Sequence, residues 1–195
     1  TRGEQFLVLE YVDGVTFDFL RETNAVPKLR HRVELLAQAA EGLAAVHEAG
    51  FLHHDVNPRN FLIDREKRVK LIDFGLAVPN TPEFRRPGNR TGTLNYMAPE
   101  LIRRETIDER IDIFAFGVLA FEFLTGRLPY DAAGSMQAMI QRINAEPLDP
   151  GAVDPSLPPA LQDLLRALTA RSRDDRPRTM RKVAETLRAL ASRKR

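Results

Sequence analysis

The sequence predicts an α+β fold in which helices form most of the body and one short β-hairpin is embedded among them. Two apolar runs at 61–63 and 69–72 flank a charged turn, which is the pattern of a hairpin. Residues 111–124 are apolar on every side, which predicts a helix that is buried all round. With 195 residues, the chain is long enough to enclose one core of this kind.

The first part of the chain predicts a strand and a long helix. A continuous apolar run at 6–9 is typical of a buried strand, and a turn follows at 10–14. Residues 28–49 have apolar side chains at i, i+3, i+4 and i+7, which predicts a helix. Gly50 suits its C-terminal cap. We expect His47 on this helix to be a packed residue and not a ligand.

The second half predicts a long loop and three more helices. Residues 76–97 are rich in proline and glycine, which favours a loop without regular structure, and loops of this length usually have a function. Beyond the central helix, apolar residues recur at helical spacing in 136–143, 161–168 and 180–191, and we expect each stripe to pack in the core. A Pro-rich connection at 147–159 separates the first two of these helices.

Composition limits the class of protein. Lys plus Arg number 29 and Asp plus Glu number 27, so the net charge of +2 gives no indication of a nucleic-acid partner. There is no cysteine, which fits an intracellular protein. No signal peptide opens the sequence, and the longest apolar run, 113–121, is too short to span a bilayer. We therefore expect a cytoplasmic domain, or the cytosolic part of a larger or membrane-anchored protein.

Polar side chains gather at the ends of the predicted hairpin. Asp55 and Asn60 precede its first strand and Asp73 follows its second, so the hairpin should bring all three together. Their oxygens suit a hard cation such as Mg²⁺, which keeps water ligands and binds substrate phosphates. A further carboxylate there could orient or deprotonate a hydroxyl, which is the equipment of phosphoryl transfer. The alternative is that these residues only form turns.

These motifs resemble those of the protein kinase family. His53-His54-Asp55 with Asn60, then Asp73-Phe74-Gly75, is similar to the catalytic and magnesium loops, and Ala98-Pro99-Glu100 to the end of the activation segment. The resemblance runs from about residue 4 to about residue 190 and covers only the C-terminal part of a kinase domain. It implies a kinase-like fold, with a last N-lobe strand at 1–9, a hinge and following helix at 10–20, a C-lobe at 21–191 and a basic linker beginning at 192–195.

The resemblance implies a serine/threonine protein kinase that uses ATP and Mg²⁺ and acts on Ser or Thr of a protein substrate. Asp55 would be the catalytic base or the group that orients the hydroxyl, and Thr93 favours serine/threonine specificity. Asn60 and Asp73 would hold magnesium. The implied ATP-binding residues are Leu9 as the gatekeeper, Glu10 and Val12 at the hinge, Thr16 near the ribose, and Leu62 below the adenine.

Other residues have structural roles by the same resemblance. His53 and Phe74, beside Gly75, belong to an apolar spine under the site. Burial of Asp112 needs hydrogen-bond partners, and the family supplies them from the catalytic-loop backbone. Glu100 is expected to pair with Arg176.

Two positions depart from the family pattern. His54 replaces an arginine that grips a phosphate on the activation loop, and a histidine is mostly neutral near pH 7. Control through loop phosphorylation, for example at Thr91, is therefore expected to be weaker. Asn57 replaces a lysine that neutralises the transferring phosphate. Arg59, four residues after Asp55, matches an arginine that compensates in tyrosine kinases, unless it simply faces solvent.

The sequence contains no Gly-rich phosphate loop, strand lysine or partner glutamate. The favoured interpretation is the C-lobe of a bacterial-type serine/threonine kinase that is fused to further domains and is inactive as the 195-residue fragment alone. The alternative is a pseudokinase or scaffold module that binds nucleotide or a partner without catalysis. A small-molecule kinase fits poorly, because Ala98-Pro99-Glu100, Asp112 and Arg176 resemble kinases of protein substrates.

Overall fold

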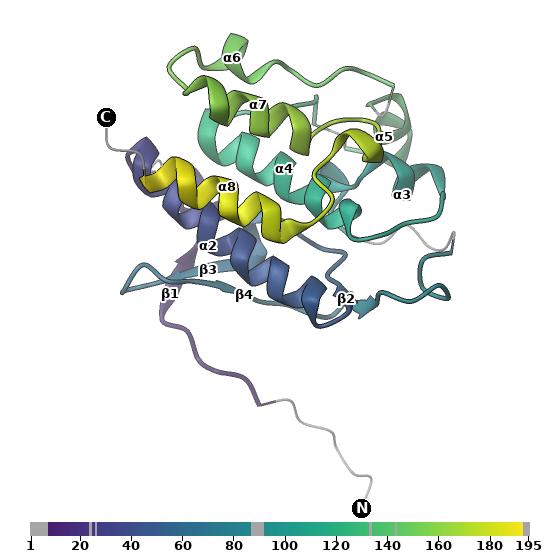
Figure 1. Ribbon diagram of the computed structural model, residues 1–195, viewed down its shortest axis with the longest axis horizontal. Coiled ribbons are helices and arrows are strands. Elements are labelled where there is room, and N and C mark those ends of the chain that lie inside the picture. The colour runs from purple at the N-terminus through teal and green to yellow at the C-terminus, as the bar shows by residue number, and fades with distance from the viewer. Residues whose placement is uncertain are drawn as a thin grey trace, which may run out of the picture.

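The computed structural model describes residues 8–23, 25, 27–86, 92–132, 134–142 and 144–192. Helices form most of this part, and the short strands lie to one side of the long helix α2, Leu29–Glu48 (Figure 1). The predicted helix at 28–49 is thus confirmed within a residue at each end. None of the described helices is both long and apolar enough to cross a membrane.

The predicted hairpin is present and belongs to a three-stranded antiparallel sheet. β3, Phe61–Asp64, pairs with β4, Val69–Leu71, so that Phe61 lies opposite Leu71. The sequence did not predict the third strand, β1, Gly14–Thr16, which pairs with the other edge of β3. β1 leads directly into the short helix α1, Phe17–Glu22.

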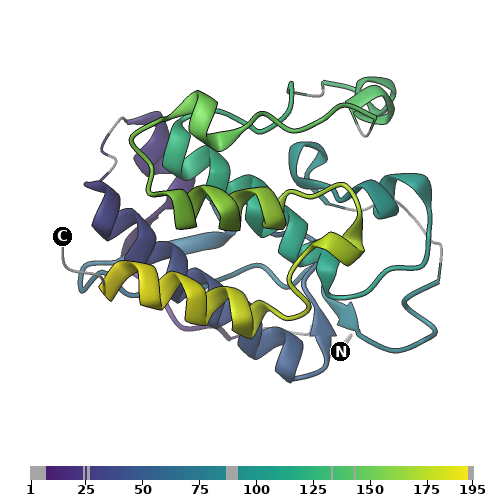
Figure 2. The same cartoon turned by 45° about the horizontal axis from the view of Figure 1, so that its top comes forward.

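The central helix α4, Arg110–Thr125, is buried along its length, as predicted. It lies between α2 and α7, Pro159–Leu168 (Figures 1 and 2). Gly117 permits the close approach of α7, because a Cβ at this position would lie 2.6 Å from the Cβ of Leu168. At the C-terminal end of α4, Arg32 donates a 2.6 Å hydrogen bond to the carbonyl of Leu124. Gly126 then ends the helix with a φ of 75°.

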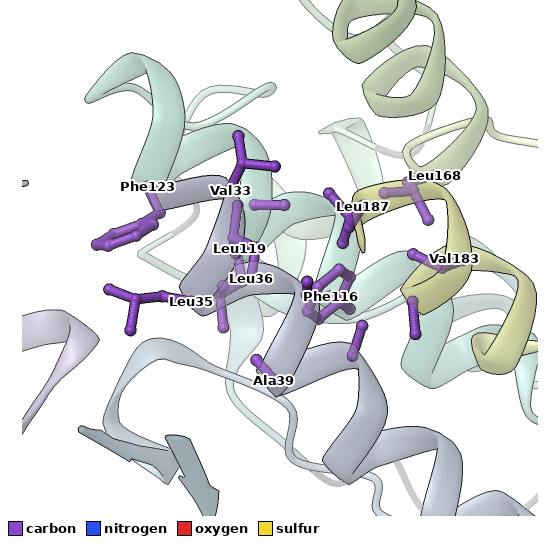
Figure 3. Close-up of a cluster of buried hydrophobic side chains, with 14 of the residues drawn as sticks. Val33, Leu35, Leu36, Ala39, Phe116, Leu119, Phe123, Leu168, Val183 and Leu187 are labelled. Atoms are coloured by element: carbon purple, nitrogen blue, oxygen red, sulfur yellow. The ribbon is translucent and has the colours of Figure 1, made fainter. Parts of the chain in front are cut away.

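The last helix, α8, Met180–Ser192, lies along α2 in both views (Figures 1 and 2). Apolar side chains from α2, α4, α7 and α8 meet in one core, including Leu36, Phe116, Leu168 and Val183 (Figure 3). The stripes predicted on α7 and α8 therefore do pack in the core. Removing these side chains from water is the main favourable term in folding.

Shorter elements complete the described chain. They are the two-residue strands β2, Phe51–Leu52, and β5, Val78–Pro79, the helices α3, Pro99–Arg103, α5, Met136–Arg142, and α6, Pro150–Val153, and the 3₁₀ helices η1, Pro58–Asn60, η2, Leu94–Tyr96, and η3, Arg173–Asp175. The helix α6 forms inside the predicted Pro-rich connection. On α5, Met139 is buried but Ile140 is exposed, so its predicted stripe reaches the core only in part, and Ile143 lies outside the described residues.

Two predictions about regular structure are wrong. Val8 and Leu9 form no strand and are 91% and 75% exposed, because none of the described residues pairs with this segment; Phe6 and Leu7 lie outside the described part. The loop at 76–97 contains regular structure after all, since β5 pairs with β2 and η2 follows. A proline is tolerated in β5 because the pairing strand is short and β5 is at an edge. Residues 87–91 of this loop lie outside the description.

Candidate active site

The catalytic loop, residues 53–60, is shaped by its own side chains. Asn57 caps η1, since its Oδ1 accepts a 2.9 Å hydrogen bond from the backbone N–H of Arg59 and Pro58 takes the first helical position. His54 adopts a left-handed backbone with φ 66°, a conformation that costs about 1 kcal/mol or more in a residue other than glycine. Such strain is concentrated at functional sites.

The carboxylate of Asp55 is held at both oxygens. Its Oδ1 accepts hydrogen bonds from the backbone N–H of Thr93 at 2.9 Å and from the hydroxyl of Thr93 at 2.7 Å. Its Oδ2 accepts a 3.1 Å bond from the amide of Asn60. Asn57 joins the set, because its amide donates to the carbonyl of Asp55 at 3.1 Å and to the Thr93 hydroxyl at 3.2 Å. Four of the predicted catalytic and metal-binding residues are therefore brought together.

A glycine makes this meeting possible. Gly92 has a φ of 114°, and a Cβ there would lie 2.6 Å from the carbonyl oxygen of His54. Any other residue would push the segment that contains Thr93 away from the catalytic loop. The loop composition at 76–97 does not by itself indicate this close approach of Gly92 to His54.

Asp73 lies at the far end of the hairpin. The backbone N–H of Ile72 donates to the carbonyl of Asn60 at 2.9 Å, which brings the backbone beside Asp73 to the Asn60 position. Asp73 is exposed, has a φ of 61° and accepts a 3.1 Å bond from the N–H of Gly75. The His53 ring contacts the ring of Phe74 edge-on, with centroids 5.2 Å apart, although Phe74 is 51% exposed.

The donor set fits magnesium better than a transition metal. Within the described residues, no group of three or more His, Cys, Asp or Glu side chains could hold a metal ion. The amide nitrogen of Asn60 is used toward Asp55, which leaves its oxygen for a cation, and Asp73 offers a carboxylate. Mg²⁺ typically takes one or two protein oxygens, with water and substrate phosphates completing its shell.

Asp112 supports the catalytic loop from below. Its carboxylate accepts hydrogen bonds from the backbone N–H groups of His53 at 2.8 Å and His54 at 2.9 Å, and from Nε2 of His47 at 2.9 Å. Burial alone would raise the pKa of Asp112, but the bonds from His47 and the backbone outweigh it and hold the pKa below its ordinary value. His47 is packed, as expected, but it also has this polar role, which its sequence position did not reveal.

His54 sits in a different environment from a phosphate-gripping arginine. Both of its ring nitrogens are buried without a hydrogen-bond partner within the described structure. Burial lowers the pKa of His54 despite the nearby charge of Asp112, so the ring is neutral at pH 7.

The first part of the activation segment is held by its own polar contacts. Arg85 donates a 2.7 Å bond from Nε to Oδ1 of Asn80, and Asn80 donates a 3.3 Å bond to the carboxylate of Glu109. The carbonyl of Arg85 also accepts a 2.9 Å bond from the N–H of Ile107. These contacts fix residues 80–85 against the start of α4.

Glu100 and Arg176 lie together, where the resemblance implies their pairing. The guanidinium donates to both carboxylate oxygens, at 2.7 and 2.9 Å, and both side chains are buried. Its three remaining donors reach the carbonyls of Ala170, Arg110 and Arg171. A buried arginine with every donor satisfied fixes the end of the activation segment to the helical body.

Arg59 is largely exposed, as the solvent-facing alternative expects, and one of its nitrogens is bonded to α1. Its Nε donates a 3.0 Å bond to Oδ2 of Asp18 in α1, and its side chain is 78% exposed. Asp18 also accepts a 2.6 Å bond from Arg21. Sequence reasoning missed both α1 residues, and only their i, i+3 spacing could have linked them to each other.

A second missed contact joins the activation segment to α4. The hydroxyl of Tyr96 donates a 2.5 Å bond to Glu122, and Arg21 approaches Glu122 at 3.6 Å. Burial and the charge of Glu122 raise the pKa of Tyr96, so the phenol stays protonated. The sequence feature that could have indicated this contact is Glu122, an acidic residue inside an otherwise apolar helix.

Only some of the predicted ATP-binding residues lie close to one another. Thr16 and Leu62 are opposite each other in the β1–β3 register, and the Thr16 hydroxyl caps α1 by accepting from the N–H of Phe19 at 3.1 Å. Glu10 is exposed and pairs with Lys70 at 2.7 Å, while Val12 is half-buried. Leu9 is 75% exposed to solvent.

A small hairpin beside a helical body, with an aspartate and an asparagine at its entrance and a second aspartate at its exit, defines a phosphotransferase type of site. The chain belongs to the protein kinase family: the family model described as "Protein kinase domain" matches residues 1–187.

Curated relatives are similar over most of the chain. It is 36% identical over 173 residues to the serine/threonine-protein kinase PknL of Mycobacterium tuberculosis, covering 88% of this chain and 43% of that protein. It is 31% identical over 191 residues to the probable serine/threonine-protein kinase pknA2 of Bifidobacterium longum, covering 97% and 25%. For PrkC of Bacillus subtilis the identity is 28% over 167 residues, covering 85% and 26%. The chain thus spans less than half the length of these relatives.

Proposed function

We propose that the intact protein is a serine/threonine protein kinase that transfers the γ-phosphate of ATP to Ser or Thr hydroxyls of a protein substrate. The observation that supports this most strongly is the Asp55 carboxylate, which is held by the backbone and hydroxyl of Thr93 on one oxygen and by Asn60 on the other. The relatives are all described as kinases, which gives the pseudokinase alternative no support.

Asp55 is the proposed group that orients or deprotonates the acceptor hydroxyl, a contribution of typically ~10²–10⁴-fold in rate. Its two oxygens are fixed by neighbours on separate segments, so the carboxylate cannot rotate away from the acceptor. Thr93 serves as a positioning residue for Asp55, and its presence supports a serine or threonine acceptor.

Asn60 and Asp73 are the residues proposed to hold Mg²⁺, which would supply positive charge to neutralise the phosphates of ATP. The proposed ATP contacts are the backbone of Glu10 and Val12 and the side chains of Leu9, Thr16 and Leu62. Because ATP is the phosphate donor, we infer that the domain works in the cytoplasm.

Arg59 is proposed to stand in for the missing lysine. The side chain of Asn57 carries no charge, and its amide and carbonyl groups already bond to Asp55, Thr93 and Arg59. Asn57 therefore braces the loop and has no group left for a phosphate. The transition state spreads negative charge over the phosphoryl oxygens, so a cation is needed beyond magnesium.

The test is phosphate transfer from radiolabelled ATP to a generic protein substrate by the intact protein, followed by identification of the labelled amino acid. We expect label on serine or threonine, and its loss in Asp55→Asn. Lys182→Ala, at an exposed position on α8, is the control that should keep full activity. We also expect no transfer by the 195-residue chain alone. An intact protein that binds ATP with magnesium but transfers no phosphate would overturn the proposal in favour of a pseudokinase.

A further inference from the structure

The guanidinium of Arg59 is anchored at one atom and free at the others. Its Nε donates to Oδ2 of Asp18 at 3.0 Å, and its two terminal amino groups make no hydrogen bond or ion pair within the described structure. The side chain is 78% exposed, so these four N–H donors are open to solvent. The backbone of Arg59 is fixed as well, because its N–H donates to Asn57.

The Asp18 carboxylate that binds Arg59 is itself held in a defined position. It lies in the first turn of α1 with a residue exposure of 9%, and its other oxygen accepts a 2.6 Å bond from Arg21. The preceding residue, Phe17, is buried and stacked on Phe61 of β3 and Phe123 of α4, with ring centroids 5.8 and 4.7 Å apart. Three elements therefore determine where the Asp18 carboxylate sits.

We propose that Asp18 is a positioning residue that holds Arg59 by Nε and presents its two terminal amino groups to anionic oxygens beside Asp55. This inference rests on the proposed function and adds a residue to it. A free arginine has many rotamers, and ordering them on substrate binding would cost binding free energy. An arginine that is already anchored can meet phosphate or carboxylate oxygens with its planar fork at a smaller cost.

The anionic oxygens have two possible sources. They belong either to the transferring phosphoryl group or to an acidic side chain of the protein substrate next to the acceptor. Both would engage the same amino groups of Arg59. If the anion is the phosphoryl group, losing the Arg59 contact should lower kcat for every substrate. If the anion is an acidic side chain of the substrate, the loss should lower kcat/KM only for acidic substrates.

Removing Asp18 has an opposing electrostatic effect that the experiment must suppress. Asp18→Asn deletes a negative charge and would by itself attract anions. That charge is already neutralised by Arg21 at 2.6 Å. Fields across an exposed surface are screened beyond about 8 Å at 0.15 M ionic strength. Because Asp18 lies 3.0 Å from Nε of Arg59, well inside that distance, the kinetics are also measured near 1 M salt, where the screening length falls to about 3 Å.

The experiment is a double-mutant cycle in the intact protein with Asp18→Asn, Arg59→Ala and both together. Two peptides are used that differ only by an acidic or a neutral residue beside the acceptor serine. We expect Arg59→Ala to lower kcat by about 10²-fold, in the range of losing one preorganised donor. Asp18→Asn should lower it by about 10-fold in the wild-type background and have no effect in the Arg59→Ala background. If the substrate supplies the anion, these losses should instead appear in kcat/KM of the acidic peptide alone.

The variant Arg59→Lys distinguishes anchoring by Asp18 from the effect of positive charge alone. In Arg59→Lys, one ammonium must serve both Asp18 and the anion, so Asp18→Asn should raise activity in that background. The matched control is Arg65→Ala, which removes an arginine that is equally 78% exposed and pairs with Asp13 at 2.7 Å. It should change neither kcat nor KM.

The anchoring role of Asp18 would be overturned if Asp18→Asn lowered activity equally with and without Arg59. It would also be overturned if Asp18→Asn raised activity in the wild-type background.

A second measurement keeps the inference testable if the intact protein transfers no phosphate and the proposed function fails. Hydrogen exchange of the Arg59 Nε–H, followed by NMR, should be slowed in the wild type and fast in Asp18→Asn. Titration with inorganic phosphate should shift this signal in the wild type at about 10-fold lower concentration than in Asp18→Asn. Equal exchange and equal phosphate affinity would refute the anchor without reference to catalysis.

Discussion

Thr93 donates two hydrogen bonds to a single carboxylate oxygen of Asp55, one from its backbone N–H at 2.9 Å and one from its hydroxyl at 2.7 Å. Thr93 is separated from Asp55 by 38 residues, and it comes from the end of the activation segment. The geometry of the acceptor-binding carboxylate therefore depends on how that segment is folded. Anything that displaces residues 92–93 should also release Asp55.

Thr93→Ala should reduce kcat, because it removes the hydroxyl bond to the Asp55 carboxylate and the acceptor for the amide of Asn57. A hydrogen bond to a charged group contributes about 1.5–3 kcal/mol, which corresponds to roughly a 10- to 100-fold loss. Thr93→Ser keeps the hydroxyl and should stay within a few-fold of wild type. Steady-state kinetics of the intact protein with a serine peptide make the comparison, and equal activity of the two variants would contradict it.

Asp112→Asn should destabilise the fold at neutral pH. The amide has only one oxygen to accept bonds from His53, His54 and His47, and a buried group left unsatisfied costs about 1–3 kcal/mol.

The pH dependence follows from the direction of the shift. The pKa of Asp112 is lower in the folded state than its ordinary value of 3.8, so its stabilising effect is present above that value. This effect is lost as the pH falls through the folded-state pKa. The difference between wild type and Asp112→Asn in urea unfolding should therefore be constant from pH 5 to 7 and shrink in strong acid. A difference that grows toward low pH would show the opposite sign of the shift.

Arg176→Ala should be among the most destabilising single changes in the chain. It leaves Glu100 buried without its partner, which costs about 3–5 kcal/mol. Arg166→Ala is the matched control: Arg166 pairs with Asp149 at 2.7 Å, but both side chains are nearly half exposed, and such surface pairs contribute little to stability. Urea unfolding of the three proteins measures both losses. Similar midpoints for the two variants would mean that the buried pair does not hold the activation segment in place.

Activity should not depend on a phosphate in the activation segment. His54 is neutral at pH 7 and cannot grip a phosphate as an arginine would, while Arg85, Asn80 and Glu109 already hold residues 80–85. Thr91, which lies outside the described residues, should tolerate replacement by alanine without loss of kcat. Phosphatase treatment of the intact protein should likewise leave kcat unchanged.

Arg85→Ala, in contrast, should loosen the same segment. Protease cleavage between residues 80 and 92 should become faster, and kcat should fall by several-fold. Loss of activity in Thr91→Ala with normal activity in Arg85→Ala would show that a phosphate, and not the Arg85 contacts, orders the segment.

The local pattern of apolar residues was enough to predict the elements that make up the body of this protein. The helix α2, the buried helix α4 and the β3–β4 hairpin all follow from periodicity, because each buries a face or a surface that the spacing of apolar residues defines. The hairpin also predicted that Asn60 and the backbone beside Asp73 would lie near each other, since the ends of a hairpin must meet. The same reasoning failed at Val8 and Leu9, because an apolar run becomes a strand only where another strand pairs with it.

For three pairs of distant side chains, only the tertiary structure decided that they meet. Arg59 and Asp18 are separated by 41 residues, Tyr96 and Glu122 by 26, and His47 and Asp112 by 65. A hydrogen bond forms only within a few tenths of an ångström of its ideal length, so it depends on the placement of whole elements, which no local pattern records. The sequence therefore determined the helices, the hairpin and the residues available for chemistry, and the packing of α1, α4 and the activation segment decided which partner each of them holds.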